Sequence, residues 1–131
     1  MPAVISNIGG KPAYIALAGY SLAGLFAIFA MYHTDMFSRI ASASGSMWYP
    51  RFVDYAKTNK LAKMPDKLYL SLGDKEAKTR NQIMAAVENN TRELYDYYNS
   101  IGINTVFEMN EGNHFKDAAL RIAKAIAWTV E

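Results

Sequence analysis

The sequence predicts an α/β fold, with one parallel sheet of about four strands flanked by helices. Three observations lead to this prediction. Short apolar runs of strand length alternate with longer runs of helical periodicity. The first strand-like run is apolar or small at most positions, which is typical of a strand covered on both faces. Glycines surround a serine where that run gives way to a helix. Strands that alternate with helices form parallel sheets through right-handed crossovers.

Four runs have the length and composition of strands. The clearest is K-L-Y-L-S-L, which alternates in polarity, is rich in strand-forming residues and stops at Gly73. The first begins at a proline, and the last follows a helix that should end at Gly102 as its C-cap. The expected strands are residues 12–18, 37–44, 67–72 and 105–109.

The segments between the strands have helical patterns. Residues 1–11 are expected to form a short helical turn or loop, 21 to about 33 a buried helix, and 51–58 a short helix before a connector. Residues 81–100 have the pattern of an amphipathic covering helix, and a last helix should pack on the same sheet. The apolar positions expected to face the core are Ile83, Val87, Leu94, Tyr98 and Ile101 in the first of these, and Phe115, Ala119, Ile122, Ile126 and Val130 in the second.

Composition limits the classes of function. The chain has 131 residues, a length that suits a single domain, and its 14 basic and 12 acidic residues are mixed along the sequence. We therefore expect no nucleic-acid-binding face. Residues 13–32 are apolar enough to resemble a membrane span, but the glycine-containing turn divides them into a strand and a helix, and we expect no membrane partner. The first twelve residues lack the pattern of a signal peptide. The absence of cysteine favours a reducing compartment, and we expect a cytoplasmic protein.

The stretch I-A-L-A-G-Y-S-L-A-G-L-F-A-I-F organises the chain. We interpret its Gly19, Ser21 and Gly24 as a strand–turn–helix of the G-x-S-x-G type. Such a turn needs glycines because a Cβ would clash with the neighbouring strand or helix, and it exposes the serine at the top of the sheet. Ser21 is therefore a candidate nucleophile, although a glycine-rich turn with a solvated serine would give the same pattern.

A serine nucleophile needs a base and an acid that orients the base. His33 should lie about 18 Å from Ser21 along one helix, at 1.5 Å per residue, so it cannot be the base. His114 follows the last strand, so it should reach the carboxyl edge of the sheet, where Ser21 is expected. Asp74 and Glu76 follow the third strand at that edge, and either could be the acid; we favour Glu76. Two histidines far apart and no cysteine make a poor metal site.

The segment G-S-M-W-Y-P carries two large aromatic residues where the sheet should open to solvent. These residues could form a lip over a pocket or merely cap the core. We assign Tyr20, Trp48 and Tyr49 to the expected substrate pocket.

Four segments together resemble the putative-esterase branch of the α/β-hydrolase superfamily, which includes siderophore-trilactone (enterochelin-type) esterases and esterase D-like enzymes. They are G-Y-S-L-A-G-L-F-A, F-S-R-I-A-S-A-S-G-S-M-W-Y, Y-L-S-L-G-D-K-E and E-G-N-H-F, in the right order. The resemblance covers nearly the whole chain from about residue 13. It implies Ser21 as the nucleophile, His114 as the base, and Glu76 or Asp74 as the acid. It also implies a carboxylic-ester substrate and no metal or organic cofactor.

The sequence also departs from this family. Members have several strands before the nucleophile turn, and one of the loops among them supplies an oxyanion-hole N–H. Here only the backbone N–H of Leu22 is expected as a donor, so the chain resembles the C-terminal half of a hydrolase. We expect a serine esterase that works through an acyl-enzyme; the alternatives are a weak or inactive fragment and an acyltransferase. We also expect association with another copy through the unpaired first strand.

Overall fold

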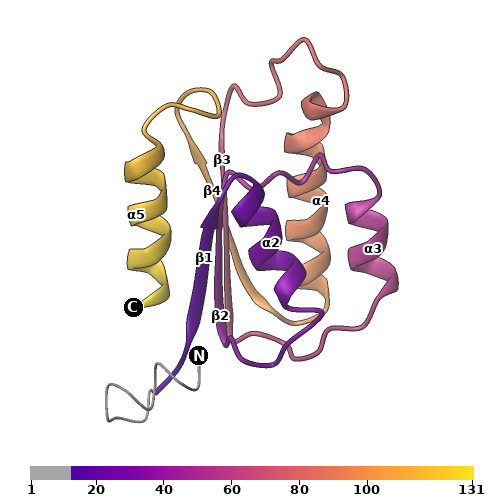
Figure 1. Cartoon of the computed structure of the whole chain (residues 1–131), viewed down its shortest axis with the longest axis vertical. Coiled ribbons are helices and arrows are strands. Elements are labelled where there is room, and N and C mark those ends of the chain that lie inside the picture. The colour runs from indigo at the N-terminus through magenta and orange to yellow at the C-terminus, as the bar shows by residue number, and fades with distance from the viewer. Residues whose placement is uncertain (1–12) are drawn as a thin grey trace.

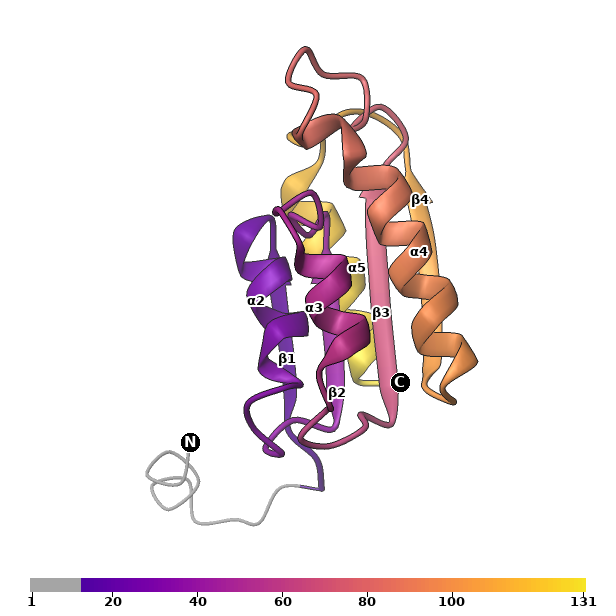
Figure 2. The same ribbon diagram turned by 90° about the vertical axis from the view of Figure 1, so that its right-hand side faces the viewer.

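The computed structural model describes residues 13–131. The expectations for residues 1–12, a short helical turn or loop without a signal peptide, lie outside the described residues. Four parallel strands form one sheet in the order β1-β2-β3-β4. The chain crosses over through helices after β1, β2 and β3, as Figures 1 and 2 show. The predicted fold class is confirmed. The strands are β1 (Ala16–Tyr20), β2 (Arg39–Ala43), β3 (Lys67–Gly73) and β4 (Asn104–Asn110).

Helices cover both faces of the sheet, as Figure 1 shows in side view. Three lie on one face: α2 (Leu22–Ala30), α3 (Phe52–Thr58) and α4 (Val87–Ser100). Helix α5 (Ala118–Thr129) covers the other face. Alternate side chains of each strand enter the two layers, so Ile40 packs under the three helices and Ala41 under α5. The turn after β1 and the loops after β3 and β4 meet at one edge of the sheet, at the top of Figure 1.

The elements differ from the predicted ranges mainly at their ends. Strand β1 begins and ends later than predicted, because its register with β2 runs from Ala16–Arg39 to Tyr20–Ala43. Helix α2 ends before His33, since the N–H groups of Met31, Tyr32 and His33 bond three residues back and tighten the last turn. The side chain of His33 contacts the Tyr55 hydroxyl, with the two atoms 2.9 Å apart.

The predicted covering helix is divided. A 3₁₀ turn (Met84–Ala86) precedes α4, and the Asn81 side chain accepts hydrogen bonds from the N–H groups of residues 83 and 84. Val87, Leu94 and Tyr98 are buried as expected, whereas Ile83 is 58% exposed and Ile101 is 37% exposed, so these two predictions are wrong. The N–H groups of residues 102 and 103 bond to the carbonyls of residues 99 and 98. Gly102, with φ of 97°, is therefore the expected glycine of a Schellman end.

The predicted buried face of the last helix is wrong. Ile122 is half-buried, but Ile126 is 49% exposed and Phe115, which precedes the helix, is 80% exposed. The helix instead turns a different stripe toward the sheet, in which Ala125 is small enough to pack closely on Ala41 and Ala43. The buried residues of α5 are Arg121, Ala125 and Thr129.

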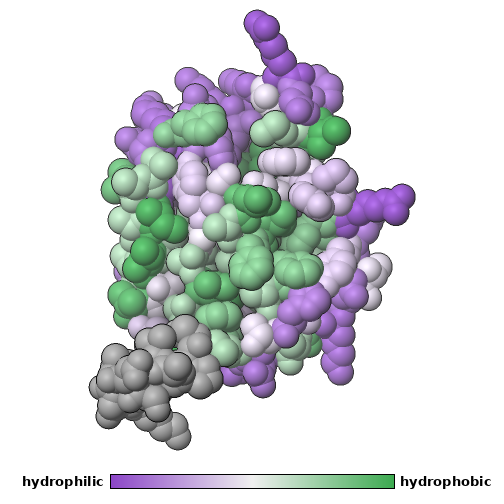
Figure 3. All heavy atoms as spheres, viewed as in Figure 1, coloured by the Kyte–Doolittle hydropathy of each residue, from purple (hydrophilic) through white to green (hydrophobic). Residues whose placement is uncertain are grey.

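An apolar groove lies on the face shown in Figure 3, where green side chains gather over α2 and its neighbour α3. Leu22 and Phe26 are more than half exposed there. None of the helices in residues 13–131 has the length and apolar character to cross a membrane. The apolar stretch before residue 33 is divided between a strand, a turn and a nine-residue helix.

Candidate active site

Ser21 lies in the turn between β1 and α2, in a backbone conformation that residues other than glycine rarely adopt. Its φ is 62° and its ψ is −124°. Such strain persists only where the surrounding structure enforces it. Here the Ser21 N–H donates to the carbonyl of Ala43 at 3.0 Å, and the Ser46 N–H donates to the carbonyl of Ser21 at 3.1 Å. Backbone hydrogen bonds to β2 and to the loop after it therefore fix the serine.

The second glycine of the turn lies one residue later than in the G-x-S-x-G pattern, so that interpretation of the spacing is corrected. Ala23 occupies the usual position and tolerates its methyl group because it is exposed. Gly24 faces the sheet instead: a Cβ there would lie 2.9 Å from Gly45 Cα and 2.9 Å from Ser42 Oγ. A Cβ on Gly19 would lie 2.2 Å from the Ala23 carbonyl oxygen. The physical need for glycine is therefore met at Gly19 and Gly24.

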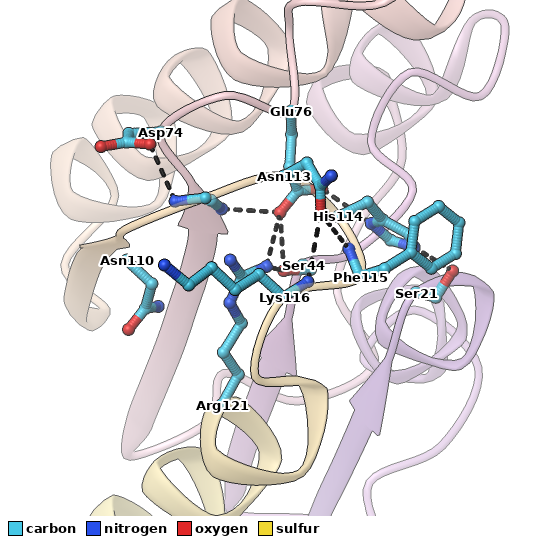
Figure 4. Close-up of polar contacts among 12 residues, drawn as sticks. Ser21, Ser44, Asp74, Glu76, Asn110, Asn113, His114, Phe115, Lys116 and Arg121 are labelled. Atoms are coloured by element: carbon cyan, nitrogen blue, oxygen red, sulfur yellow. Dashed lines mark hydrogen bonds and ion pairs between the residues drawn. The ribbon is translucent and has the colours of Figure 1, made fainter.

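His114 lies in the loop between β4 and α5 and contacts both Ser21 and Glu76 (Figure 4). Its Nε2 is 2.9 Å from Ser21 Oγ, and its Nδ1 is 2.7 Å from Glu76 Oε1. An ionised carboxylate can only accept, so Nδ1 carries the proton and Nε2 is left to accept the serine hydroxyl proton. Serine, imidazole and carboxylate therefore form a continuous hydrogen-bonded array, which we call the Ser21–His114–Glu76 array.

Glu76 lies in the turn after β3, with only 3% of its side chain exposed. Burial alone would raise the pKa of this carboxyl, but hydrogen bonds from His114, the Gly73 N–H and the Ser44 hydroxyl outweigh it and lower the pKa below its usual range. The Gly73 N–H and the Ser44 hydroxyl both donate to Oε2, at 2.6 and 2.7 Å. Glu76 is therefore held as a carboxylate, with Oε1 facing the imidazole.

Asp74, the alternative acid, does not contact the imidazole. Its Oδ1 accepts the backbone N–H of Gly112 at 3.0 Å, and its own N–H donates to the Asn110 carbonyl. Asp74 thus ties the end of β3 to the loop that carries His114 (Figure 4).

Arg121 also contributes to this site, although its sequence pattern does not predict such a role. Its guanidinium, 1% exposed, donates from Nη1 to Ser44 Oγ at 3.2 Å and to Glu76 Oε2 at 3.3 Å. Its Nη2 donates to the Glu111 carbonyl at 3.1 Å. The sequence carries no clear signal for this role, because an arginine is almost never fully buried unless it has a partner, and its partner here lies on another element.

Tyr20, assigned to the substrate pocket from the sequence, contacts the backbone of the histidine loop. Its hydroxyl donates to the carbonyl of His114, and the two rings lie 5.3 Å apart between centroids. Burial raises the pKa of Tyr20 above its usual value, so its hydroxyl stays protonated and able to donate at neutral pH. Tyr20 therefore supports His114 from β1.

A cavity of about 260 Å³ opens beside the array. Trp48 lines it together with Ser21 and His114, whereas Tyr49 is 52% exposed and lines the separate apolar groove between α2 and α3. The structure thus brings Trp48 to the serine and not Tyr49. Two cations, Lys75 and Lys78, also border the cavity. Within residues 13–131, no three His, Cys, Asp or Glu residues are grouped so that they could hold a metal ion.

Leu22 begins α2 directly after Ser21, and its N–H is the expected oxyanion donor. Within residues 13–131 this N–H makes no hydrogen bond, as is usual for the first residues of a helix. It is therefore available as a hydrogen-bond donor beside Ser21.

Comparisons with known proteins agree with this architecture. The family model described as Putative esterase matches residues 1–122. A curated relative, the uncharacterized protein YbbA of Bacillus subtilis, is 23% identical over a 128-residue alignment; the match covers 93% of this chain and 51% of the relative. The chain thus spans about half the length of that relative.

Solved structures of esterases share the fold. The enterobactin esterase FES of Shigella flexneri, crystallised in the presence of enterobactin, superposes with a TM-score of 0.72 at 21% identity, covering 98% of this chain and 33% of the other. An IroE-like serine hydrolase of Shewanella oneidensis superposes with a TM-score of 0.70 at 14% identity, and the match covers 95% of this chain and 42% of the other. Because the family model matches residues 1–122 of the 131 in this chain, the chain belongs to the putative esterase family.

Proposed function

We propose that this protein hydrolyses carboxylic esters through an acyl-enzyme on Ser21, with His114 as general base and Glu76 as the acid that orients it. One observation carries the proposal: Ser21 Oγ, the imidazole of His114 and the buried carboxylate of Glu76 are joined by hydrogen bonds of 2.9 and 2.7 Å. Nucleophile, base and orienting acid within hydrogen-bond reach are the requirements for an activated serine.

In the acylation step, Ser21 Oγ attacks the ester carbonyl carbon while His114 Nε2 accepts the hydroxyl proton. The carbonyl oxygen becomes an oxyanion and accepts a hydrogen bond from the Leu22 N–H. The carboxylate of Glu76 stabilises the imidazolium that forms. The C–O bond to the alcohol then breaks, and Nε2 returns the proton to the departing alcohol oxygen, which leaves an acyl ester on Ser21.

Deacylation repeats these steps with water. His114 Nε2 takes a proton from a water molecule, whose oxygen attacks the acyl carbon, and Nε2 then protonates Ser21 Oγ as the ester bond breaks. The products are a carboxylic acid and free serine. An alcohol in place of water would make the same site an acyltransferase.

We further propose that the bound ester carries an anionic or strongly polar group, because Lys75 and Lys78 border the cavity. The Glu76 carboxylate, which also borders the cavity, is already paired with Arg121 and does not neutralise these lysines. Enterobactin esterases among the structural neighbours make polar cyclic esters one class to test. The chain spans about a third of the length of the enterobactin esterase FES of Shigella flexneri. The absence of cysteine supports a cytoplasmic location.

Hydrolysis of p-nitrophenyl acetate by the purified chain tests the proposal. We expect slow turnover, because Leu22 is the single oxyanion donor identified in residues 13–131, and loss of one donor typically costs about 10² to 10³ in rate. Ser21→Ala should abolish turnover. Ser100→Ala, which removes an exposed hydroxyl at the end of α4, is the matched control and should leave turnover unchanged.

Three outcomes separate the alternatives. Release of p-nitrophenol that depends on Ser21 supports an esterase. A p-nitrophenol rate that rises with added alcohol, together with formation of the new ester, supports an acyltransferase. A folded chain that neither turns over the ester nor forms an acyl-enzyme is a non-catalytic fragment and contradicts the proposal for this chain.

A further inference from the structure

Arg121 is a buried cation on a helix stripe that otherwise presents apolar or small side chains to the sheet. It is among the largest fully buried side chains of the described residues. Removing a guanidinium from water is costly, and replacing a buried ion pair by apolar side chains is often neutral or stabilising. Packing of α5 on the sheet alone would therefore favour a leucine or methionine at this position. This indicates that the arginine serves the site beside it.

The contacts of Arg121 lie on the side of Glu76 that faces away from His114. Glu76 Oε2 is 3.3 Å from Arg121 Nη1, and the same Nη1 donates to the Ser44 hydroxyl that itself donates to Oε2. Ser44 has a φ of 47°, so the backbone at the end of β2 also adopts an uncommon conformation next to this contact. With Oε2 engaged in this way, rotation of the carboxylate is restricted and Oε1 stays directed at the imidazole.

The second arm of the guanidinium reaches the loop of the base. Arg121 Nη2 donates to the carbonyl of Glu111, which lies three residues before His114 in the same loop. One planar group therefore contacts the acid after β3 and the loop after β4, while its own backbone belongs to α5 (Figure 4). A lysine could supply the charge but not the two-armed geometry.

We propose that Arg121 is a positioning residue that fixes the Glu76 carboxylate and the His114 loop in the relative arrangement needed to activate Ser21. Arg121 contacts neither Ser21 nor the cavity, and it acts through Glu76 and the backbone of the loop that carries His114. The inference rests on the proposed function, and it makes docking of α5 a condition for an ordered active site.

Covalent labelling of Ser21 by a fluorophosphonate provides the first test. Arg121→Met should lower the labelling rate by about tenfold to a hundredfold, by analogy with the loss seen when a residue that orients a metal ligand is removed. Arg121→Lys should recover part of the rate. Lys124→Met is the control, because it removes a cation from the exposed side of the same helix. The Nζ of Lys124 lies 3.5 Å from Glu108 Oε1, and its loss should leave the labelling rate unchanged.

A double variant separates positioning from a general loss of structure. Because Arg121 acts in part through Glu76, Arg121→Met should slow labelling less in a Glu76→Gln background than in the unchanged chain, since the two effects are not additive. Equal slowing in both backgrounds would contradict the proposal. If Arg121→Met does not fold, as judged by the dispersion of its amide NMR spectrum, Arg121→Lys gives the deciding comparison.

The imidazole NMR signals of His114 give a readout that needs no turnover. In the unchanged chain the Nδ1–H, donated to Glu76, should appear as a slowly exchanging downfield proton, assigned with a His33→Gln variant. Arg121→Met should lose this signal and mix the two tautomers. An intact signal with an unchanged labelling rate would overturn the proposal. If the unchanged chain shows the signal but does not react with the fluorophosphonate, the proposed function fails while the NMR comparison still decides the role of Arg121.

Discussion

The two sides of the candidate site are held in different ways. The serine side, the turn that carries Ser21, is fixed by backbone hydrogen bonds and by the close approach of Gly19 and Gly24 to neighbouring backbone. The acid–base side is fixed by side chains, in which Glu76 contacts Ser44, His114 and Arg121, residues 32 to 45 positions away in sequence. The turn with Ser21 follows β1, which is an outer strand of the sheet in residues 13–131. Glu76 follows β3, which has a strand on each side.

This difference predicts how each side should fail. Added bulk on the serine side meets backbone that cannot move without disturbing the sheet, so a substitution there should cost stability. A substitution on the acid–base side can remove a hydrogen-bonding group with little change in volume, so it should cost reactivity before it costs stability.

The largest effect is expected for the acid. Glu76→Gln should lower turnover or fluorophosphonate labelling by about 10⁴, the loss seen when an orienting carboxylate of this kind becomes an amide. Asp74→Asn should cost less than about tenfold, because its amide oxygen can still accept the Gly112 N–H. Labelling rates of the two variants measure the difference. A larger loss for Asp74→Asn would transfer the role of the acid to Asp74.

The next effect concerns stability on the serine side. Gly24→Ala should lower the free energy of unfolding by about 1 to 3 kcal/mol or more, because its methyl group would overlap Gly45 and Ser42. Ala23→Gly, at the neighbouring exposed position, should cost at most about 1 kcal/mol. Urea denaturation of both variants gives the comparison. Equal stability of Gly24→Ala and the unchanged chain would show that the turn can relax.

A smaller effect follows from the lowered pKa of Glu76. The folded state holds this proton less tightly than the unfolded state, so the carboxylate contributes stability above the unfolded pKa near 4.5, and this contribution is lost as the pH falls through the folded pKa. The stability difference between the unchanged chain and Glu76→Gln should therefore be larger at about pH 7 than at about pH 3.5. Urea midpoints at the two pH values measure it. A difference independent of pH would contradict an ionised Glu76.

The smallest effect concerns association. We propose that β1, which pairs only with β2 among the described residues, and the exposed apolar Leu22 and Phe26 beside it mediate contact between copies of the chain. Light scattering should give a mass above that of a monomer, and Phe26→Glu should lower it. Ile101→Glu, at the far end of α4, serves as the control. A monomer at all concentrations would contradict this proposal.

The same contrast explains what could be predicted from the sequence. The fold class and the turn at Ser21 were predictable because strand, glycine turn and helix are neighbours in the chain, and helical periodicity is local. The role of Gly102 was predictable for the same reason. The expected core face of α5 was wrong, because apolar spacing alone could not show that a buried Glu76 on another element requires Arg121 on that face. Tyr20 and Tyr49 were assigned to the pocket because sequence position does not show which side of a strand or loop faces the serine.

Peptide mapping of the chain after reaction with a fluorophosphonate tests the central claim most directly. Ser21, Ser44 and Ser46 all line the same cavity, but only Ser21 contacts the imidazole of His114. We predict one adduct, on Ser21, which is lost in His114→Asn while the fold is kept. Absence of any adduct, or an adduct on Ser44 or Ser46, would contradict the assignment of Ser21 as the activated nucleophile.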